Sequence, residues 1–187
     1  KPPVPVRPEG PWEIVRFADA DALYVCLLPD TPLPGEQRRP VHIQLPHRAF
    51  VYDVRAKQAL GQTDAVETTL APGQPQIYAL LPYDVRKITV KPAAEVAAGA
   101  DLPVDVALDL APSRRCARHC IRIELAGPDG RTLRHYAQNV VTGRPAVRTT
   151  IPLAVNDPAG RWTIRATDVA TGRANQAAFT VTPAASD

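Results

Sequence analysis

The chain has 187 residues, of which 21 are proline, 45% are hydrophobic and 22% are charged. The hydrophobic and charged fractions are ordinary for a globular protein and exclude a disordered chain, while the proline share is about twice the usual one. The formal net charge is only +3, so composition does not indicate an acidic partner such as nucleic acid. No apolar run approaches the roughly 20 residues that a membrane-spanning helix needs.

The first eleven residues carry prolines at positions 2, 3, 5, 8 and 11. Because proline fixes φ and removes a backbone donor, residues 1–11 are predicted to form an extended Pro-rich linker. The sequence contains no methionine and starts at Lys1. We therefore expect a matured product or the C-terminal part of a longer protein.

Short β-branched or alternating runs follow, separated by Pro, Gly, Asp or Asn at intervals of about 8–12 residues, a pattern typical of β-sandwiches. The first series predicts a β-sandwich domain over residues 12–83. Its predicted strands cover residues 12–17, 23–28, 41–45, 50–55, 66–70 and 77–80.

The second series predicts an immunoglobulin-like β-sandwich over residues 84–183, followed by a short tail over 184–187. Its predicted strands cover residues 85–91, 102–110, 121–126, 132–141, 147–153, 162–168 and 175–181. About seven strands in about a hundred residues is an immunoglobulin-like count. The fold class is therefore all-β, with two consecutive antiparallel β-sandwich domains and almost no helical periodicity.

The three cysteines allow two interpretations. Three residues separate Cys116 from Cys120, a spacing that could close a small disulfide loop. Such a loop would indicate an exported protein in an oxidising compartment. They could also remain thiols, whereas a zinc site lacks a second Cys/His pair downstream. Cys26 lies in an apolar run and is predicted to be a small buried hydrophobic residue.

One stretch is densely basic and contains Arg114, Arg115 and Arg118. Nucleic-acid binding would favour interleaved aromatic residues, and none is present here. A solvated loop and strand edge is the favoured interpretation, and these arginines remain candidates for an interface or a glycan contact.

A search for catalytic motifs gives no catalytic, cofactor-binding or metal-binding residue. The four histidines lack metal-ligand spacing, the two serines lie outside any Gly-x-Ser-x-Gly motif, and no glycine-rich phosphate loop occurs. Asp53 and Asp168 both precede hairpin turns, where an aspartate is expected to accept backbone hydrogen bonds. We therefore predict a protein that is not itself an enzyme and needs no cofactor.

The aromatic residues could in principle form a flat platform for a sugar ring. Trp162 opens an alternating strand and Tyr136 alternates with small and polar residues, so both are predicted to face a core. Trp12 follows Pro11 at the end of the linker and is the better candidate for an interface or glycan contact.

Several turn and strand motifs resemble the C-terminal β-sandwich and immunoglobulin-like region of large bacterial glycoside-hydrolase-like proteins, including β-galactosidase-type ones. The matching stretches are 51–55 (VYDVR), 60–64 (LGQTD), 70–73 (LAPG), 78–83 (YALLPY), 127–130 (GPDG), 135–140 (HYAQNV), 151–162 (IPLAVNDPAGRW) and 167–172 (TDVATG). These motifs are structural and identify a type of module better than an activity.

The resemblance implies a non-catalytic accessory module that packs on or spaces a catalytic domain N-terminal to Lys1. It would act in domain architecture, assembly or weak glycan contact, outside the cell or in the cell envelope. Expected partners are other domains of the same protein or identical subunits, with carbohydrate as a further candidate and neither nucleic acid nor a membrane span. An alternative is a self-assembling surface or filament subunit, since edge strands and Pro-rich arms commonly join such modules.

Overall fold

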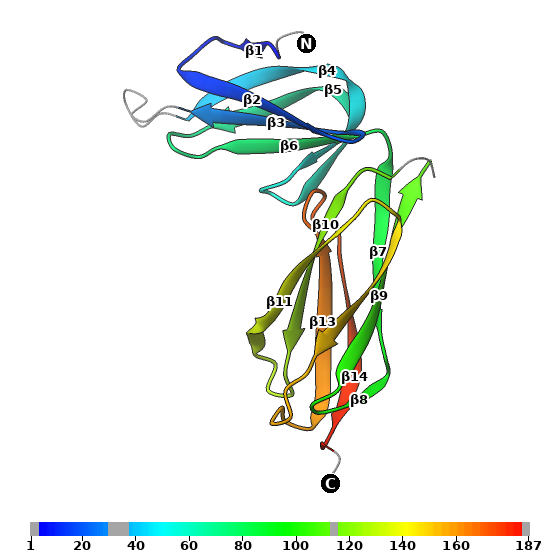
Figure 1. Ribbon diagram of the computed structural model, residues 1–187. Helices are drawn as coiled ribbons and strands as arrows, with labels where there is room; N and C mark the ends of the chain where they lie inside the picture. The colour runs from blue at the N-terminus through cyan, green and yellow to red at the C-terminus, as the bar shows by residue number, and fades with distance from the viewer. Residues whose placement is uncertain (1–3, 30–37, 113–115, 185–187) are drawn as a thin grey trace. The chain divides into compact units, whose positions relative to one another are not determined.

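The computed structural model describes residues 4–29, 38–112 and 116–184 (Figure 1). The described chain is all-β, as predicted. It divides into two compact units, Lys1–Asp84 and Val85–Asp187. Each unit has its own buried apolar residues and is described separately below.

The N-terminal unit is built on one six-stranded antiparallel sheet. The sheet order is β1-β4-β6-β3-β2, and β5 pairs with both halves of β4. The strands are β1 (Val6–Arg7), β2 (Trp12–Asp19), β3 (Ala22–Pro29), β4 (Arg39–Asp53), β5 (Gln58–Leu70) and β6 (Gln76–Leu81).

Strand β4 folds this sheet over on itself. Its first half pairs with β1 and its last four residues pair with β6, while its register against β5 shifts between Gln44 and Ala49. Such irregularities bend a strand and increase its twist. Pro46 and His47, which we expected to separate two strands, lie inside this irregular part of one continuous strand.

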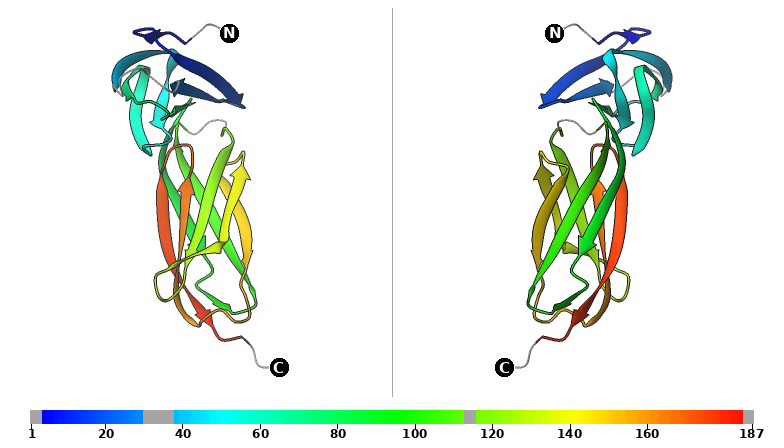
Figure 2. Two further views of the ribbon diagram at one scale, coloured as in Figure 1. Left: turned by 90° about the vertical axis from the view of Figure 1, so that its left-hand side faces the viewer. Right: turned by 90° about the vertical axis from the view of Figure 1, so that its right-hand side faces the viewer.

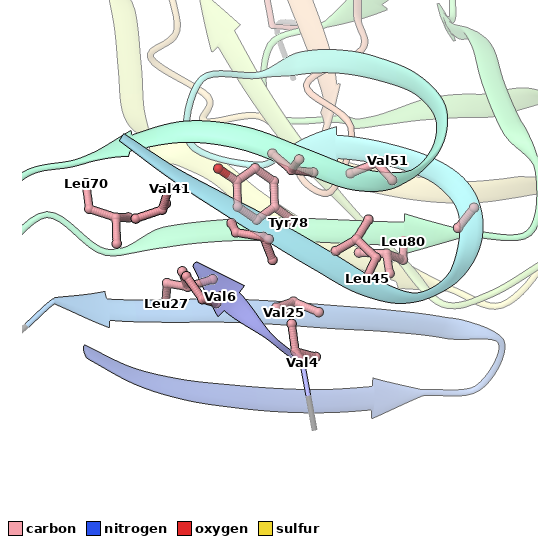
Figure 3. Close-up of a cluster of buried hydrophobic side chains, with 13 residues drawn as sticks. Val4, Val6, Val25, Leu27, Val41, Leu45, Val51, Leu70, Tyr78 and Leu80 are labelled. Carbon is pink, nitrogen blue, oxygen red and sulfur yellow. The ribbon is translucent and has the colours of Figure 1, made fainter. Parts of the chain in front are cut away.

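The core of this unit lies between the two layers of the folded sheet. Figure 3 shows Val25 and Leu27 of β3 pointing toward Val4 and Val6 at the N-terminus. Val4 is 4% exposed and Val6 is 6% exposed.

The prediction of a Pro-rich linker is therefore wrong for the described part of residues 1–11. Val6 pairs with Ile43, and the alternation of Val4 and Val6 places both side chains in the core. Prolines are tolerated beside them because β1 is an edge strand, where a missing backbone donor costs little.

The C-terminal unit is a sandwich of two sheets, whose long strands run lengthwise side by side (Figure 2). Five strands form one sheet in the order β11-β10-β13-β14-β8, and three form the other in the order β12-β9-β7. Its strands are β7 (Asp84–Pro92), β8 (Glu95–Ala97), β9 (Asp101–Ala111), β10 (His119–Ala126), β11 (Thr132–Thr142), β12 (Ala146–Pro152), β13 (Gly160–Asp168) and β14 (Ala174–Thr182).

One short strand departs from the expected pattern. Strand β8 pairs in parallel with β14, although the sequence predicted antiparallel sheets and no strand over residues 93–100. Gly99 follows β8 with φ +84 and lies against Val155, so the chain turns sharply there. A left-handed φ of this kind favours glycine.

The core of the C-terminal unit confirms the two aromatic predictions. Trp162 is completely buried and Tyr136 is 8% exposed. Their ring centroids are 6.1 Å apart, and the Phe179 ring centroid lies at the same distance from that of Trp162. The Trp162 indole N–H donates to the Pro158 carbonyl at 3.0 Å, which satisfies its one polar group.

Candidate functional site

A buried polar cluster lies in the C-terminal unit where β10 begins and β13 ends. The His119 ring donates from Nδ1 to Asp168 Oδ1 at 2.9 Å, and both side chains are fully buried. The Thr171 hydroxyl donates to Asp168 Oδ2 at 2.5 Å. Each carboxylate oxygen thus has a donor, as a buried charged group requires.

This cluster corrects the comparison of the two hairpins. Asp53 behaves as predicted, because its Oδ1 accepts the backbone N–H groups of Arg55 at 3.0 Å and Ala56 at 2.8 Å. Asp168 instead directs both side-chain oxygens at His119 and Thr171. Sequence analysis missed the pair. The available signal was that His119 stands at every second position with the apolar residues Ala117 and Ile121, as residues on one face of a strand do.

A second polar cluster closes the loop before β13. The Tyr136 hydroxyl donates to Asp157 and accepts the Ala154 N–H at 2.8 Å. Burial, and next the hydrogen bond to Asp157, raises the pKa of the Tyr136 phenol. The phenol therefore stays neutral at ordinary pH and acts as a structural link between β11 and the loop.

The structure shows no bond between Cys116 and Cys120. Their disulfide stays a prediction.

The cysteines are also poorly suited to chemistry. Burial, and next the charge of Asp168, raises the pKa of Cys120, while burial raises the pKa of Cys26. Nucleophilic and metal-binding cysteines need the thiolate form, which a raised pKa disfavours. Cys26 is half-buried rather than buried as predicted, because it lies on the outer face of β3.

Part of the basic stretch lies within the described residues. Arg114 and Arg115 lie outside the described residues. Arg118 is exposed, and a methyl group placed on Gly143 would lie 3.9 Å from the Arg118 side chain. Its role as an interface or glycan contact stays a prediction.

An open groove of about 440 Å³ lies on the outer face of the three-stranded sheet. Its charged residues include Lys91, Asp105 and Arg148. Arg148 makes two hydrogen bonds to Asp105, of 2.7 and 2.9 Å, and these hold the pKa of Asp105 below its usual value. The carboxylate is thus kept ionised and already bound, so it is a poor general acid.

Within the described residues, no three His, Cys, Asp or Glu side chains gather closely enough to hold a metal ion. The same part of the chain contains no helix that could span a membrane. These two findings concern residues 4–29, 38–112 and 116–184.

The feature that most resembles a functional surface is an apolar strip on the outer face of β2 and β3. It consists of Val15, Phe17, Tyr24, Cys26 and Leu28, and the strand register places Val15 beside Cys26 and Phe17 beside Tyr24. Phe17 is 61%, Val15 41% and Leu28 36% exposed. Several large exposed apolar side chains together commonly mark an interaction site.

Two separate cavities open on the opposite, inner side of β2. One cavity of about 380 Å³ is lined by Val4, Val6, Trp12 and Ile14 among others. A second cavity of the same volume is lined by Arg16, several alanines and residues of the irregular part of β4, Pro46 and His47. We call these two cavities together the β2 groove.

Trp12, the candidate for an interface or glycan contact, lies in the first of these cavities. Its ring packs partly against the core, and a methyl group placed on Gly10 would lie only 2.2 Å from a ring atom. Gly10 therefore covers part of the ring surface. The glycan contact stays a prediction, but the ring is less open than a sugar platform requires.

No protein-family model matches the sequence, and no curated protein matches it. Among solved structures, the chain is similar to an α2-macroglobulin from Salmonella, with 14% identity and a TM-score of 0.41 over 91% of this chain and 12% of that one. It is also similar to a β-glucuronidase from Parabacteroides merdae, with 9% identity and a TM-score of 0.34 over 89% of this chain and 28% of that one.

A third similar structure is an isomalto-dextranase from Arthrobacter globiformis, with 16% identity and a TM-score of 0.29 over 87% of this chain and 30% of that one. The chain thus spans less than a third of the length of each of these proteins. At these TM-scores the likenesses carry no argument about the function of this chain.

Proposed function

We propose that the chain is a non-catalytic β-sandwich module of an exported, carbohydrate-active-enzyme-like protein, acting in domain architecture and assembly. The observation that carries the assembly role is the apolar strip, where Phe17 and Val15 are 61% and 41% exposed on the last strand of a sheet. The association with carbohydrate-active enzymes rests on the turn and strand motifs in the sequence.

The polar clusters favour this proposal over a catalytic one. The one buried histidine–carboxylate pair, among the described residues, is enclosed on all sides and bound to Thr171, so a substrate cannot reach it. The acid of the open groove is occupied by Arg148. Chemistry needs reactive groups that a substrate can contact.

The coding sequence upstream of Lys1 gives the most direct test. We expect it to encode a large catalytic domain in the same reading frame. A signal peptide immediately upstream, with no further domain, would contradict the accessory-module proposal and favour a separate secreted protein.

The weak glycan contact has its own test. Binding of the purified chain to a glycan array, lost in Trp12→Ala and kept in Trp162→Phe, would support a glycan site at the β2 groove. Binding that survives Trp12→Ala would place any glycan contact elsewhere.

The alternative is a self-assembling surface or filament subunit, which the unpaired side of an end strand favours. Negative-stain microscopy and sedimentation of the purified chain distinguish it. Long or open-ended assemblies would support it, whereas small closed species would contradict it.

A further inference from the structure

We propose that two copies of this chain form a two-fold dimer by antiparallel pairing of their β2 strands, with Val15 opposite Val15 of the second copy. The inference rests on the assembly role proposed above and names an identical chain as the partner. Four features of the N-terminal unit lead to it: the position of β2, the β2 groove, the order of charges along β2 and the apolar strip.

The first feature is that β2 ends its sheet. In the described part of the chain it pairs with β3 alone, over eight residues. Natural edge strands are commonly short, or carry a lysine, a proline or a bulge that prevents pairing with another chain. Strand β2 has no lysine, proline or bulge, and its register with β3 is regular throughout. The inward-facing Arg16 is the one feature of β2 that guards such an edge.

The second feature is the size pattern along the β2 groove. The inward side chains of β2 are large at one end, Trp12 and Ile14, and small at the other, Ala18. Ala20 and Ala22 line the same small end. Antiparallel pairing about Val15 sets Trp12 of one copy opposite Ala18 of the second copy, so the bulky indole meets a small side chain. It also sets Ile14 opposite the long aliphatic stem of Arg16.

The third feature, charge, selects the register. In this dimer the outer faces of both sheets lie on the same side. Because side chains alternate between the two faces of a strand, the two-fold axis must then pass between one residue and the same residue of the second copy. Centring on Glu13 or Arg16 would place like charges directly opposite each other, which is destabilising. Centring on Val15 avoids this and pairs all seven residues from Trp12 to Ala18.

The fourth feature is the outer face. Pairing about Val15 brings the two apolar strips together into one continuous surface across both copies. Val15 then contacts Val15 of the second copy. Phe17 of each copy lies opposite Glu13 of the second copy, and the Phe17 ring can pack on the aliphatic part of that glutamate side chain. The exposed apolar area of each strip is thereby reduced.

Sedimentation velocity of the full chain, from micromolar to submillimolar concentration, tests the dimer. We expect a reversible monomer–dimer equilibrium that Val15→Lys weakens at least about tenfold, because two ammonium groups would face each other at the axis. Val141→Lys is the matched control, since Val141 is 63% exposed on β11, the end strand of another sheet. This control should dimerise like the parent.

A cross-linking experiment tests the register itself. Val15→Cys is placed in a chain whose three cysteines are changed to serine, because Cys26 lies beside Val15 and would otherwise compete for it. Oxidation should give a covalent dimer, since opposite Cβ atoms in such a pair are about 5 Å apart. Val141→Cys in the same background should give little.

A chain that stays monomeric throughout, or a dimer that Val15→Lys does not weaken, would overturn the proposal. Equal cross-linking of the Val15→Cys and Val141→Cys variants would overturn the proposed register. Open-ended assemblies in sedimentation would overturn the closed dimer. None of these results bears on the upstream coding sequence, so the accessory-module proposal is tested separately.

Discussion

Two buried tyrosines of the N-terminal unit differ in one hydrogen bond. Tyr52 and Tyr78 are each 1% exposed. The Tyr52 hydroxyl donates to Asp84 at 2.7 Å, whereas the Tyr78 hydroxyl has no partner in hydrogen-bond geometry among the described residues. Burial raises the pKa of the Tyr78 phenol, against a smaller opposing effect of Thr68, so the desolvated hydroxyl stays neutral.

Removing these two hydroxyls should have opposite effects on stability. Tyr78→Phe is expected to leave the free energy of unfolding unchanged or raise it by about 1 kcal/mol, because an unsatisfied buried hydroxyl is costly. Tyr52→Phe should lower it by about 1–2 kcal/mol, because Asp84 loses its donor. Urea unfolding measures both, and equal losses in the two variants would contradict the assignment.

Asp168 and Asp53 offer a second matched pair at the scale of single residues. Asp168→Ala leaves His119 and Thr171 without their buried acceptor and should lower the free energy of unfolding by about 3 kcal/mol or more. Asp53→Ala removes two exposed turn hydrogen bonds and should cost about 1 kcal/mol. Thermal unfolding of both variants checks the order, and an Asp53→Ala that is the more damaging would reverse our interpretation.

At the scale of elements, the sequence predicted the strands with strong alternation or punctuation. The strand expected over residues 102–110 is β9, and the one expected over 162–168 lies within β13. Gly130, with φ +76, ends the predicted tight turn, its N–H bonding Gly127 at 2.9 Å. Turn residues act on the few residues next to them, so turns can be predicted from a single sequence.

The elements that were missed depend on distant partners. Strand β1 exists because β4 lies beside it, and β4 runs through Pro46 because β5 pairs with both of its halves. No local pattern carries that information. The apolar strip was missed for the same reason, since its exposure depends on where the folded sheet ends.

The role of the N-terminal arm in the core can be measured directly. Val6→Ala should lower the free energy of unfolding by about 2 kcal/mol, because it removes buried methyl groups and leaves a cavity. Val141→Ala, at an exposed position, should change it by about 0.5 kcal/mol or less. Equal small effects in denaturant unfolding would restore the interpretation of residues 1–11 as a linker.

At the scale of the whole molecule, the chain consists of two units with separate cores. Each unit contains one of the two tryptophans, Trp12 and Trp162, in contact with its core. Long sequence separations inside each unit are closed by sheet pairing, as between β9 and β12 in the three-stranded sheet. A unit with its own core is expected to fold alone.

Residues 85–187, expressed alone, should therefore fold with one cooperative transition. Trp162 is completely buried, so its fluorescence should be blue-shifted in the fragment and should shift to the red at the same midpoint as the loss of circular dichroism. Non-coincident transitions, or strong binding of a hydrophobic dye, would show that this unit depends on the rest of the chain.

The half-buried thiols have a consequence for resistance to oxidation. Peroxide attacks thiolates and the thioether of methionine, and this sequence contains no methionine. Because burial raises the pKa of Cys26 and Cys120, both stay mostly in the protonated form that peroxide attacks slowly. The fold therefore offers oxidants few targets and would tolerate environments where thioether-rich cores are damaged.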